Sequence, residues 1–235
     1  MPLHIHAVET DIAPVVLLPG DPQRAERIAA RLEAAVCYNR NRGLLGFTGL
    51  HNGVRVSVQT SMMGAPSTAI VAEELVQLGV RTLIRTGTAG ALGDRVTPGD
   101  LLVATASTPL DGTTAAYLDG RPYAPTASFG VVHALVAAAE ARGMNAVAGP
   151  LVTDDVFYHP DAERLQAWAD FGALAVEMET SALFTVAARH RVDAGAIVTV
   201  SNFVGAAGDW LGPEALTAAV DRMILVALDA AAALA

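Results

Sequence analysis

Two acidic side chains, Glu177 and Glu179, flank Met178 in a stretch, residues 173–182, whose other members are mostly apolar or small. A carboxylate in such surroundings is costly unless polar groups meet it. If the stretch continues a strand, both glutamates point to one face and Met178 to the other. Taken alone, the pair also fits an exposed strand end or a helix N-terminus. At the carboxyl end of a buried strand, however, it suits the binding of neighbouring hydroxyl groups, as on a sugar.

Arginine provides all 15 basic residues, and the chain contains no lysine. This excludes a Schiff-base lysine and the lysine-bearing phosphate loop, and guanidinium groups suit oxyanions such as phosphate. Arg24 follows a turn at residues 19–22, where the first turn of a helix favours an anion. Arg85 and Thr88 lie at or beside a glycine-rich turn predicted at residues 87–90, which lets the backbone approach a ligand closely. An ordinary solvated arginine or a crowded turn explains each feature separately, but together they suit phosphate.

An aromatic ring and an amide follow two further predicted strands. Phe157 can stack on a flat heterocycle, and Asn202 can form hydrogen bonds with its edge. Phosphate, sugar and base together indicate nucleoside chemistry. The sequence has no Cys/His cluster that would predict a metal site, and it lacks the Gly-x-Ser-x-Gly motif of serine hydrolases.

The elements that must position these residues alternate along the chain. The 235 residues are 52% hydrophobic and show no linker or repeat, so we expect one α/β domain, residues 1–235, with a mixed, mostly parallel central sheet flanked by helices. Strands are predicted at residues 15–18, 54–59, 82–86, 101–106, 147–153 and 195–201. Helices are predicted at residues 23–32, 67–78, 129–142, 165–171 and 214–234, with another running from the acidic stretch to about residue 190. Turn-rich or loop segments are predicted at residues 87–90, 111–125 and 203–213.

Composition limits the partners and the compartment. A net charge of −9 and a pI near 5.0 argue against nucleic acids and anionic membranes as partners. The single cysteine, Cys37, allows no intrachain disulfide and fits a reducing compartment. The first residues do not look like a secretion signal, and the apolar run 223–235 is too short to span a membrane. We therefore expect a cytoplasmic protein.

Seven motifs, in order along the chain, resemble those of one known family. They are VLLPGDPQRA, NRGLLGFTG, SMMGAPS, IRTGTAGAL, DDVFY, VEMET and VSN. Together they cover nearly the whole chain and are similar to the hexameric bacterial purine nucleoside phosphorylases, whose family also includes uridine phosphorylase. The resemblance implies phosphorolysis of nucleosides, with inorganic phosphate as a co-substrate and with neither cofactor nor metal. It also implies a homohexamer built as a trimer of dimers.

Carried over position by position, the resemblance implies three subsites. The phosphate site would contain Gly20, Arg24, Arg85 and Thr88, with Arg42 supplied by a neighbouring subunit. The ribose site would contain Met63, Met178 and Glu179, with His4 supplied by the neighbour. The base site would contain Thr88, Ala89, Gly90, Phe157, Val176, Glu177, Ser201 and Asn202. Among these, we expect the catalytic residues to be Arg24, Arg85, Glu179 and Asn202.

Asn202 departs from the family pattern. Many members carry an aspartate here, together with an arginine in the following loop that helps it protonate the purine. This chain has an amide and no arginine between Asn202 and Arg222. An amide cannot act as a general acid, but it can form a hydrogen bond to N7 or to a 6-oxo group as the base leaves. We therefore expect inosine and guanosine to be preferred over adenosine.

Three alternatives remain open. The segment TASTPLDGTT resembles the uridine phosphorylase branch, although the chain has no room between Tyr158 and Glu177 for that branch's inserted pyrimidine-binding segment. A hydrolytic nucleosidase would share the fold but would not need both Arg24 and Arg85. A nucleoside-binding module would bind the same ligands without turnover. Phosphate-dependent release of free base separates these cases.

Overall fold

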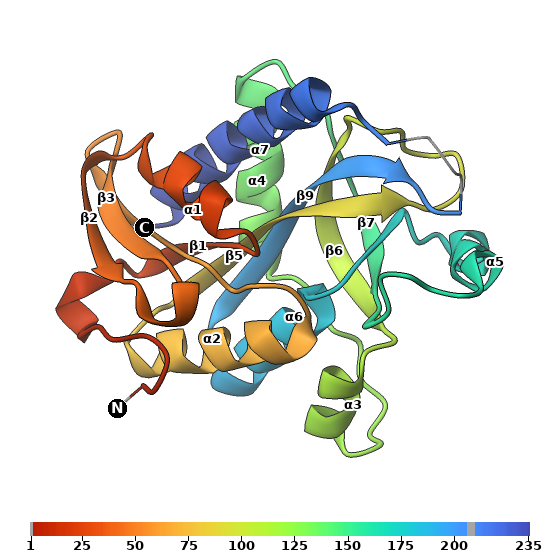
Figure 1. The fold of residues 1–235 in the computed structure, drawn as a ribbon, viewed down its shortest axis with the longest axis horizontal. Coiled ribbons are helices and arrows are strands. Elements are labelled where there is room, and N and C mark those ends of the chain that lie inside the picture. The colour runs from red at the N-terminus through yellow and green to blue at the C-terminus, as the bar shows by residue number, and fades with distance from the viewer. Residues whose placement is uncertain (1, 206–209) are drawn as a thin grey trace.

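The computed structural model describes residues 2–205 and 210–235, which form one mixed sheet covered by helices (Figure 1). The sheet has nine strands in the order β2-β3-β4-β1-β5-β8-β7-β6-β9. Because β5 also pairs with β9, the strands β5, β8, β7, β6 and β9 close on themselves, and β1, β4, β3 and β2 extend from β5. The strands are β1 (Val15–Pro19), β2 (Glu33–Asn39), β3 (Gly46–His51), β4 (Val54–Gln59), β5 (Thr82–Ala91), β6 (Leu101–Pro109), β7 (Ala146–Thr153), β8 (Ala175–Glu177) and β9 (Asp193–Phe203).

Helices lie on both faces of the sheet. The α-helices are α1 (Pro22–Ala29), α2 (Ala65–Gln77), α3 (Gly112–Leu118), α4 (Phe129–Ala141), α5 (Ala162–Gln166), α6 (Thr180–His190) and α7 (Pro213–Leu234). Short 3-10 turns are formed by Glu9–Asp11, Asn41–Gly43 and Ala167–Phe171. In Figure 1, α2 and α6 lie on one side of the sheet, and α4 and α7 lie on the other.

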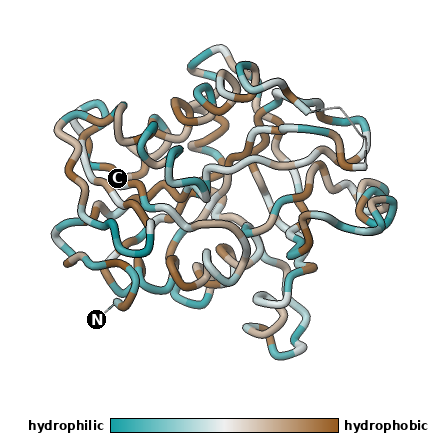
Figure 2. The backbone as a smooth tube through the Cα atoms, viewed as in Figure 1, coloured by the Kyte–Doolittle hydropathy of each residue, from teal (hydrophilic) through white to brown (hydrophobic). Residues whose placement is uncertain are grey.

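Strand β1 shows how the core is divided between these layers. All five of its residues are buried, as expected for a strand with helices on both faces. Val16 and Leu18 belong to the hydrophobic cluster that includes α2 and α6, whereas Val15 and Leu17 belong to the cluster of α1, α4 and α7. Figure 2 shows brown, hydrophobic residues through much of this interior and teal residues in many of the outer loops.

The predicted fold class is confirmed, with parallel pairing among β1, β4, β5 and β9 and among β6, β7 and β8. The parallel strands were the easier ones to predict, because burial on both faces gives continuous apolar runs. Two strands, β2 and β3, were not predicted. They lie at one edge of the sheet, and β2 is largely exposed, so its residues lack the apolar pattern of a buried strand.

Two predicted turns are wrong. Residues 87–90 do not form a turn, because β5 continues through them to Ala91 and pairs with β9 along its whole length. Residues 111–125 are not simply turn-rich, because they contain α3, whose N-cap Asp111 accepts a hydrogen bond from the backbone of Thr114 (2.6 Å). Both Asp111 and Thr114 are buried.

Smaller differences concern helix boundaries and one loop. The helix predicted at residues 165–171 is instead the end of α5 followed by a 3-10 turn, Ala167–Phe171. Of the loop predicted at residues 203–213, residues 206–209 lie outside the described part of the chain. Across residues 2–205 and 210–235, no helix has both the length and the apolar character needed to cross a membrane.

Candidate active site

A cavity of about 1090 Å³ opens where β1, β5, β8 and β9 meet the segments that follow them. Its volume is sufficient for a ligand the size of a nucleoside with phosphate beside it. Every predicted site residue except His4 and Arg42 lines this cavity. These lining residues are Gly20, Arg24, Met63, Arg85, Thr88, Ala89, Gly90, Phe157, Val176, Glu177, Met178, Glu179, Ser201 and Asn202.

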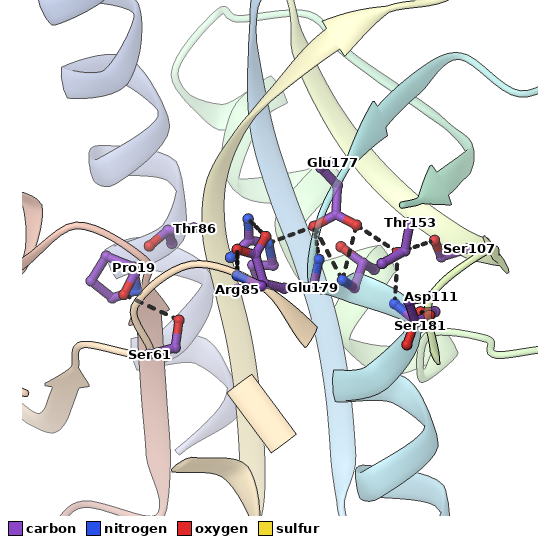
Figure 3. A network of polar contacts seen from close by, with 12 residues as sticks. Pro19, Ser61, Arg85, Thr86, Ser107, Asp111, Thr153, Glu177, Glu179 and Ser181 are labelled. Carbon is purple, nitrogen blue, oxygen red and sulfur yellow. Dashed lines mark hydrogen bonds and ion pairs between the residues drawn. The ribbon is translucent and has the colours of Figure 1, made fainter. Parts of the chain in front are cut away.

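Arg85, in the middle of β5, is the buried cation around which one end of the cavity is organised (Figure 3). Its Nε donates to Glu177 Oε2 (2.8 Å), and its Nη2 forms an ion pair with Glu179 Oε2. Gly87 leaves room for this guanidinium group, because a Cβ atom at position 87 would lie 2.9 Å from Arg85 Nη2. The two glutamates therefore do meet a polar partner, although Glu179 is the N-cap of α6 and not a strand residue.

Glu177 is held by protein donors on both carboxylate oxygens. Thr153 Oγ1 donates to Oε1 (2.6 Å), and the backbone N–H groups of Glu179 and Thr180 donate from the first turn of α6 (both 2.9 Å). The carboxylate thus caps the N-terminus of α6 while it pairs with Arg85. This capping role of Glu177 was not predicted from the sequence, and its predicted contact with the base stays a prediction.

A buried chain of hydrogen bonds continues from Glu177 toward α3 (Figure 3). Ser107 Oγ lies 2.7 Å from Thr153 Oγ1, which also accepts the backbone N–H of Ser181 (2.9 Å). The Ser181 hydroxyl then donates to Asp111, the N-cap of α3. Because each of these groups is buried and paired, the chain fixes the position of the Glu177 carboxylate.

Two guanidinium nitrogens of the cavity-lining residues Arg24 and Arg85 are buried without a protein partner. Within the described residues, neither Arg24 Nε nor Arg85 Nη1 has a hydrogen-bond acceptor. Arg24 Nη1 donates to the carbonyl oxygen of Thr86 (3.0 Å), which places Arg24 beside β5. Burial, and then the nearby charge of Arg85, lower the pKa of Arg24 to about 10. Arg24 is still charged at neutral pH, and an anion between the two guanidinium groups would relieve both the unpaired donors and the repulsion.

Glu179 joins this cationic end to the middle of the cavity. Its Oε1 accepts the backbone N–H of Gly64 (2.7 Å), and its Oε2 pairs with Arg85. Burial raises the pKa of Glu179, the charge of Arg85 opposes that rise, and the charge of Glu177 adds to it. Met63 and Met178 line the cavity near by and offer an apolar surface beside the carboxylate.

The opposite end of the cavity carries an oriented amide and several aromatic rings. Ser201 Oγ donates to Asn202 Oδ1 (2.8 Å), and Asn202 Nδ2 donates to the carbonyl oxygen of Phe203 (3.1 Å). The Ser201 hydroxyl also lies 3.2 Å from the carbonyl oxygen of Ala89. Ser201 occupies one of the two lone pairs of Oδ1 and Phe203 accepts one of the two N–H groups of Nδ2, so Asn202 keeps an N–H donor for a ligand.

His4 and Arg42 do not line the cavity of their own chain. His4 Nδ1 lies 2.7 Å from Glu74 Oε1 on α2, and the backbone N–H groups of Leu3, His4 and Ile5 donate to the same carboxylate. Arg42 is exposed and has a positive φ of 55°. Their predicted contribution to a neighbouring subunit's site therefore stays a prediction.

The sequence reasoning missed several residues that line the cavity. Asp154 and Tyr158 belong to the same motif, DDVFY, as the predicted Phe157, and Tyr158 is a candidate beside Phe157 at this strand end, so that motif was the available signal for them. Trp210 had no such signal, because it lies in a predicted loop. The missed residues are Asp21, Pro22, Met62, Asp154, Val156, Tyr158, His159, Ala162, Leu165, Phe203, Val204, Gly205 and Trp210.

Among residues 2–205 and 210–235, no group of three or more His, Cys, Asp or Glu side chains is placed to hold a metal ion.

Comparisons with known proteins agree with this arrangement. Residues 14–234 match a family model described as the phosphorylase superfamily. The chain is 43% identical over 233 residues to a DeoD-type purine nucleoside phosphorylase of Exiguobacterium sibiricum, covering 98% of this chain and 99% of the relative. It is 47% identical over 204 residues to one of Caldanaerobacter subterraneus (86% of this chain, 88% of the relative) and 43% identical over 233 residues to one of Clostridium perfringens (98% and 99%).

Proposed function

The chain belongs to the phosphorylase superfamily, and from this premise we propose that it cleaves purine nucleosides with inorganic phosphate. In this reaction a phosphate oxygen forms a bond to C1′ of the sugar as the bond from C1′ to N9 of the base breaks. The base keeps the electron pair of that bond and takes up a proton. The products are the free base and ribose 1-phosphate, or its deoxy counterpart. The family resemblance predicted from the seven motifs is confirmed.

The observation that carries this proposal is the pair of buried, unpartnered donors on Arg24 and Arg85 in the same cavity as Glu179 and Asn202. A hydrolytic nucleosidase needs no such anion site, because its nucleophile is water. Guanidinium donors buried next to a carboxylate suit a reaction in which the anion and a neutral diol bind side by side.

The mechanism follows from these positions. Arg24 and Arg85 hold phosphate below the anomeric carbon, so that it serves as nucleophile and as counter-charge to an oxocarbenium-like transition state. Glu179 accepts hydrogen bonds from the 2′- and 3′-hydroxyl groups and fixes the sugar. Because Glu179 and Arg85 form an ion pair, the groups that hold the sugar and the phosphate are positioned relative to each other before either ligand binds.

We further propose that 6-oxopurines are preferred. Ser201 engages Oδ1 of Asn202, so this side chain presents an N–H donor to the base. That donor fits N7, which all these purines carry, and also the 6-oxo group of inosine and guanosine, whereas the 6-amino group of adenosine offers it no acceptor. The donor also stabilises negative charge on the leaving base without transferring a proton.

The test is release of free base from inosine, guanosine, adenosine and uridine, each with and without phosphate. We expect phosphate-dependent release that is fastest with inosine and guanosine. Release that does not depend on phosphate would indicate a nucleosidase, and no release at all would indicate a binding module. Comparable kcat/KM values for adenosine and inosine would contradict the proposed base preference but not the proposed phosphorolysis.

We also propose that His4 and Arg42 complete the cavity of a neighbouring copy in a homohexamer. Both side chains lie outside the cavity of their own chain, and Arg42 is exposed. The test mixes two inactive variants, Arg42→Ala and Glu179→Gln, after dissociation and reassociation. Recovered activity is expected, because some mixed sites regain both wild-type side chains. No recovery in verified mixed oligomers would contradict the shared site.

A further inference from the structure

Trp210 is an aromatic residue of the cavity to which neither the sequence motifs nor the proposed mechanism gives a role. We propose that Trp210 and Phe157 together form the aromatic surface on which the purine base stacks, so that Trp210 is a base-contact residue that contributes to substrate choice. This inference deepens the function proposed above and rests on it.

The backbone places Trp210 directly beside the amide predicted to bind the base. Trp210 forms an antiparallel bridge with Asn202, and the N–H of Leu211 donates to the carbonyl oxygen of Ser201 (2.9 Å). Side chains of directly paired residues in an antiparallel bridge lie on the same face, with Cβ atoms about 5 Å apart. Since Asn202 lines the cavity, the pairing directs Trp210 to the cavity as well.

The ring of Trp210 also lies close to that of Phe157. Their centroids are 6.4 Å apart and their planes are inclined by 39°. Phe157 in turn contacts Tyr158 edge to face, with centroids 5.0 Å apart. Phe157 comes from the segment after β7 and Trp210 from the segment after β9, so two distant parts of the chain contribute to one aromatic surface.

Exposure supports a ligand-binding role for these rings. Trp210 is 53% exposed and Phe157 is 60% exposed, although both line a cavity next to the hydrophobic core. Exposed faces of large aromatic rings are unfavourable in water, and a planar base would cover them. Replacing such an aromatic side chain by alanine typically weakens base binding about tenfold or more.

The chain contains two tryptophans, Trp168 and Trp210, so fluorescence can isolate the second one. Trp168 contacts Phe171 and packs against a small hydrophobic cluster that reaches the cavity through Leu165, Val176 and Val204, but Trp168 itself does not line the cavity. In a Trp168→Phe variant, Trp210 is the only tryptophan, and excitation at a wavelength that tyrosine does not absorb reports it selectively. We expect inosine, in phosphate-free buffer, to quench this emission with saturation. Ribose 1-phosphate, which lacks a base, should leave it nearly unchanged.

Kinetics provide the second measurement. Trp210→Ala should raise the KM for inosine about tenfold, as expected for a lost stacking contact, with the KM for phosphate unchanged. Trp210→Phe, which keeps a ring, should recover most of the loss. The matched control is Phe171→Ala, which removes an aromatic ring that is 82% exposed but lies outside the cavity lining, and it should change neither KM.

The outcomes separate this inference from the proposed function. Quenching by inosine reports binding and does not require turnover, so it supports a base contact even if no nucleoside is cleaved. Unchanged Trp210 emission in an enzyme that cleaves inosine would overturn the inference and leave the function intact. Equal quenching by ribose 1-phosphate, or equal increases in both KM values for Trp210→Ala, would overturn it too.

Discussion

The cationic end of the cavity and its aromatic end differ in how firmly the protein holds their side chains. Arg85, Glu177 and Glu179 are 5%, 4% and 3% exposed, and ion pairs and hydrogen bonds connect all three. Phe157 and Trp210, in contrast, are more than half exposed and contact other side chains of the described residues mainly through ring edges and tilted faces.

This difference indicates a division of tasks within one cavity. Charges that must stabilise a transition state are most effective when they are fixed before the reaction, in surroundings that exclude water. Side chains that determine base specificity need no such buried network, and they can be substituted without disturbing the hydrophobic core. We therefore expect substitutions at the cationic end to reduce turnover and substitutions at the aromatic end to alter substrate choice.

Glu179→Gln should have the largest effect. The substitution keeps the shape of the side chain but removes the charge that pairs with Arg85 and binds the sugar diol. We expect kcat/KM for inosine to fall about 10²- to 10³-fold, as for the loss of a preorganised electrostatic contact. Steady-state kinetics and a thermal melt measure activity and folding separately. Turnover close to the wild-type value would contradict the view that the cationic end of the cavity stabilises the transition state.

Arg24→Gln should act chiefly on phosphate. The guanidinium group has a buried donor available for the anion, and a hydrogen bond to a charged group contributes about 1.5–3 kcal/mol. This corresponds to an increase of about 10- to 100-fold in the KM for phosphate, with a smaller change in the KM for inosine. Initial rates with each substrate varied in turn give both values. A selective change in the KM for inosine would contradict the assignment of this end to phosphate.

Thr153→Val tests whether the buried network positions the charged residues. The threonine contacts no part of the proposed substrates, but its hydroxyl donates to Glu177. We expect kcat to fall about tenfold, which corresponds to about 1.4 kcal/mol, and Thr153→Ser should restore it.

Thr199→Val is a matched control for this substitution. It also removes a buried hydroxyl from a strand, but that hydroxyl donates to the carbonyl oxygen of Ala219 on α7 (3.4 Å). If both valine variants lower the melting temperature equally and kcat equally, Thr153 has only a structural role.

Asn202→Asp should change selectivity more than rate. A carboxyl group can donate a proton to N7 of adenosine, which the amide cannot. We expect the ratio of kcat/KM for adenosine to that for inosine to rise by about three- to tenfold, because the family's arginine partner is missing from this chain. Competition between the two nucleosides in one reaction measures the ratio directly. A lower ratio would contradict the proposed role of the amide.

Asp221→Asn should have the smallest effect, because Asp221 does not line the cavity. Asp221 accepts hydrogen bonds from Arg27 and Arg31, which tie α1 to α7. Burial alone would raise the pKa of Asp221, but these hydrogen bonds outweigh it and lower the pKa. The ion pair therefore stabilises the protein above the ordinary pKa of aspartate, and this stabilisation is lost as the pH falls through the folded value.

Because the pair is partly exposed, the loss at pH 7 should be below about 1 kcal/mol. Urea denaturation at pH 7 and at pH 3 should show a difference from wild type that becomes smaller in acid. A difference that grows in acid would contradict the expected pH dependence of the stabilisation by Asp221. A change in kcat would show that the contact between α1 and α7 affects the cavity.

The sequence predicted those parts of the site where charged side chains stand in an otherwise apolar stretch. Glu177 and Glu179 in an apolar stretch predicted a buried polar partner, and Arg85 is that partner. The apolar runs of the parallel strands likewise predicted the sheet, because their burial on both faces leaves a clear pattern.

Other features depend on contacts between distant parts of the chain, and no local pattern reports them. Residues 87–90 look like a turn because they are small, but pairing with β9 keeps them extended. Thr153 and Asp111 are ordinary residues until the fold places them around Ser181. Trp210 comes next to Asn202 only through an isolated bridge.

Strand β5 has a consequence for the ligands that the cavity can accept. It carries Arg85 at the cationic end and Gly90 near the aromatic end. Since an extended strand advances by about 3.3 Å per residue, these two positions are about 16 Å apart along the chain. Removing one residue between them would shorten that span and would also turn every later side chain to the opposite face of the sheet. The number of residues in β5 is therefore as much a determinant of the accepted ligand length as their chemical identity.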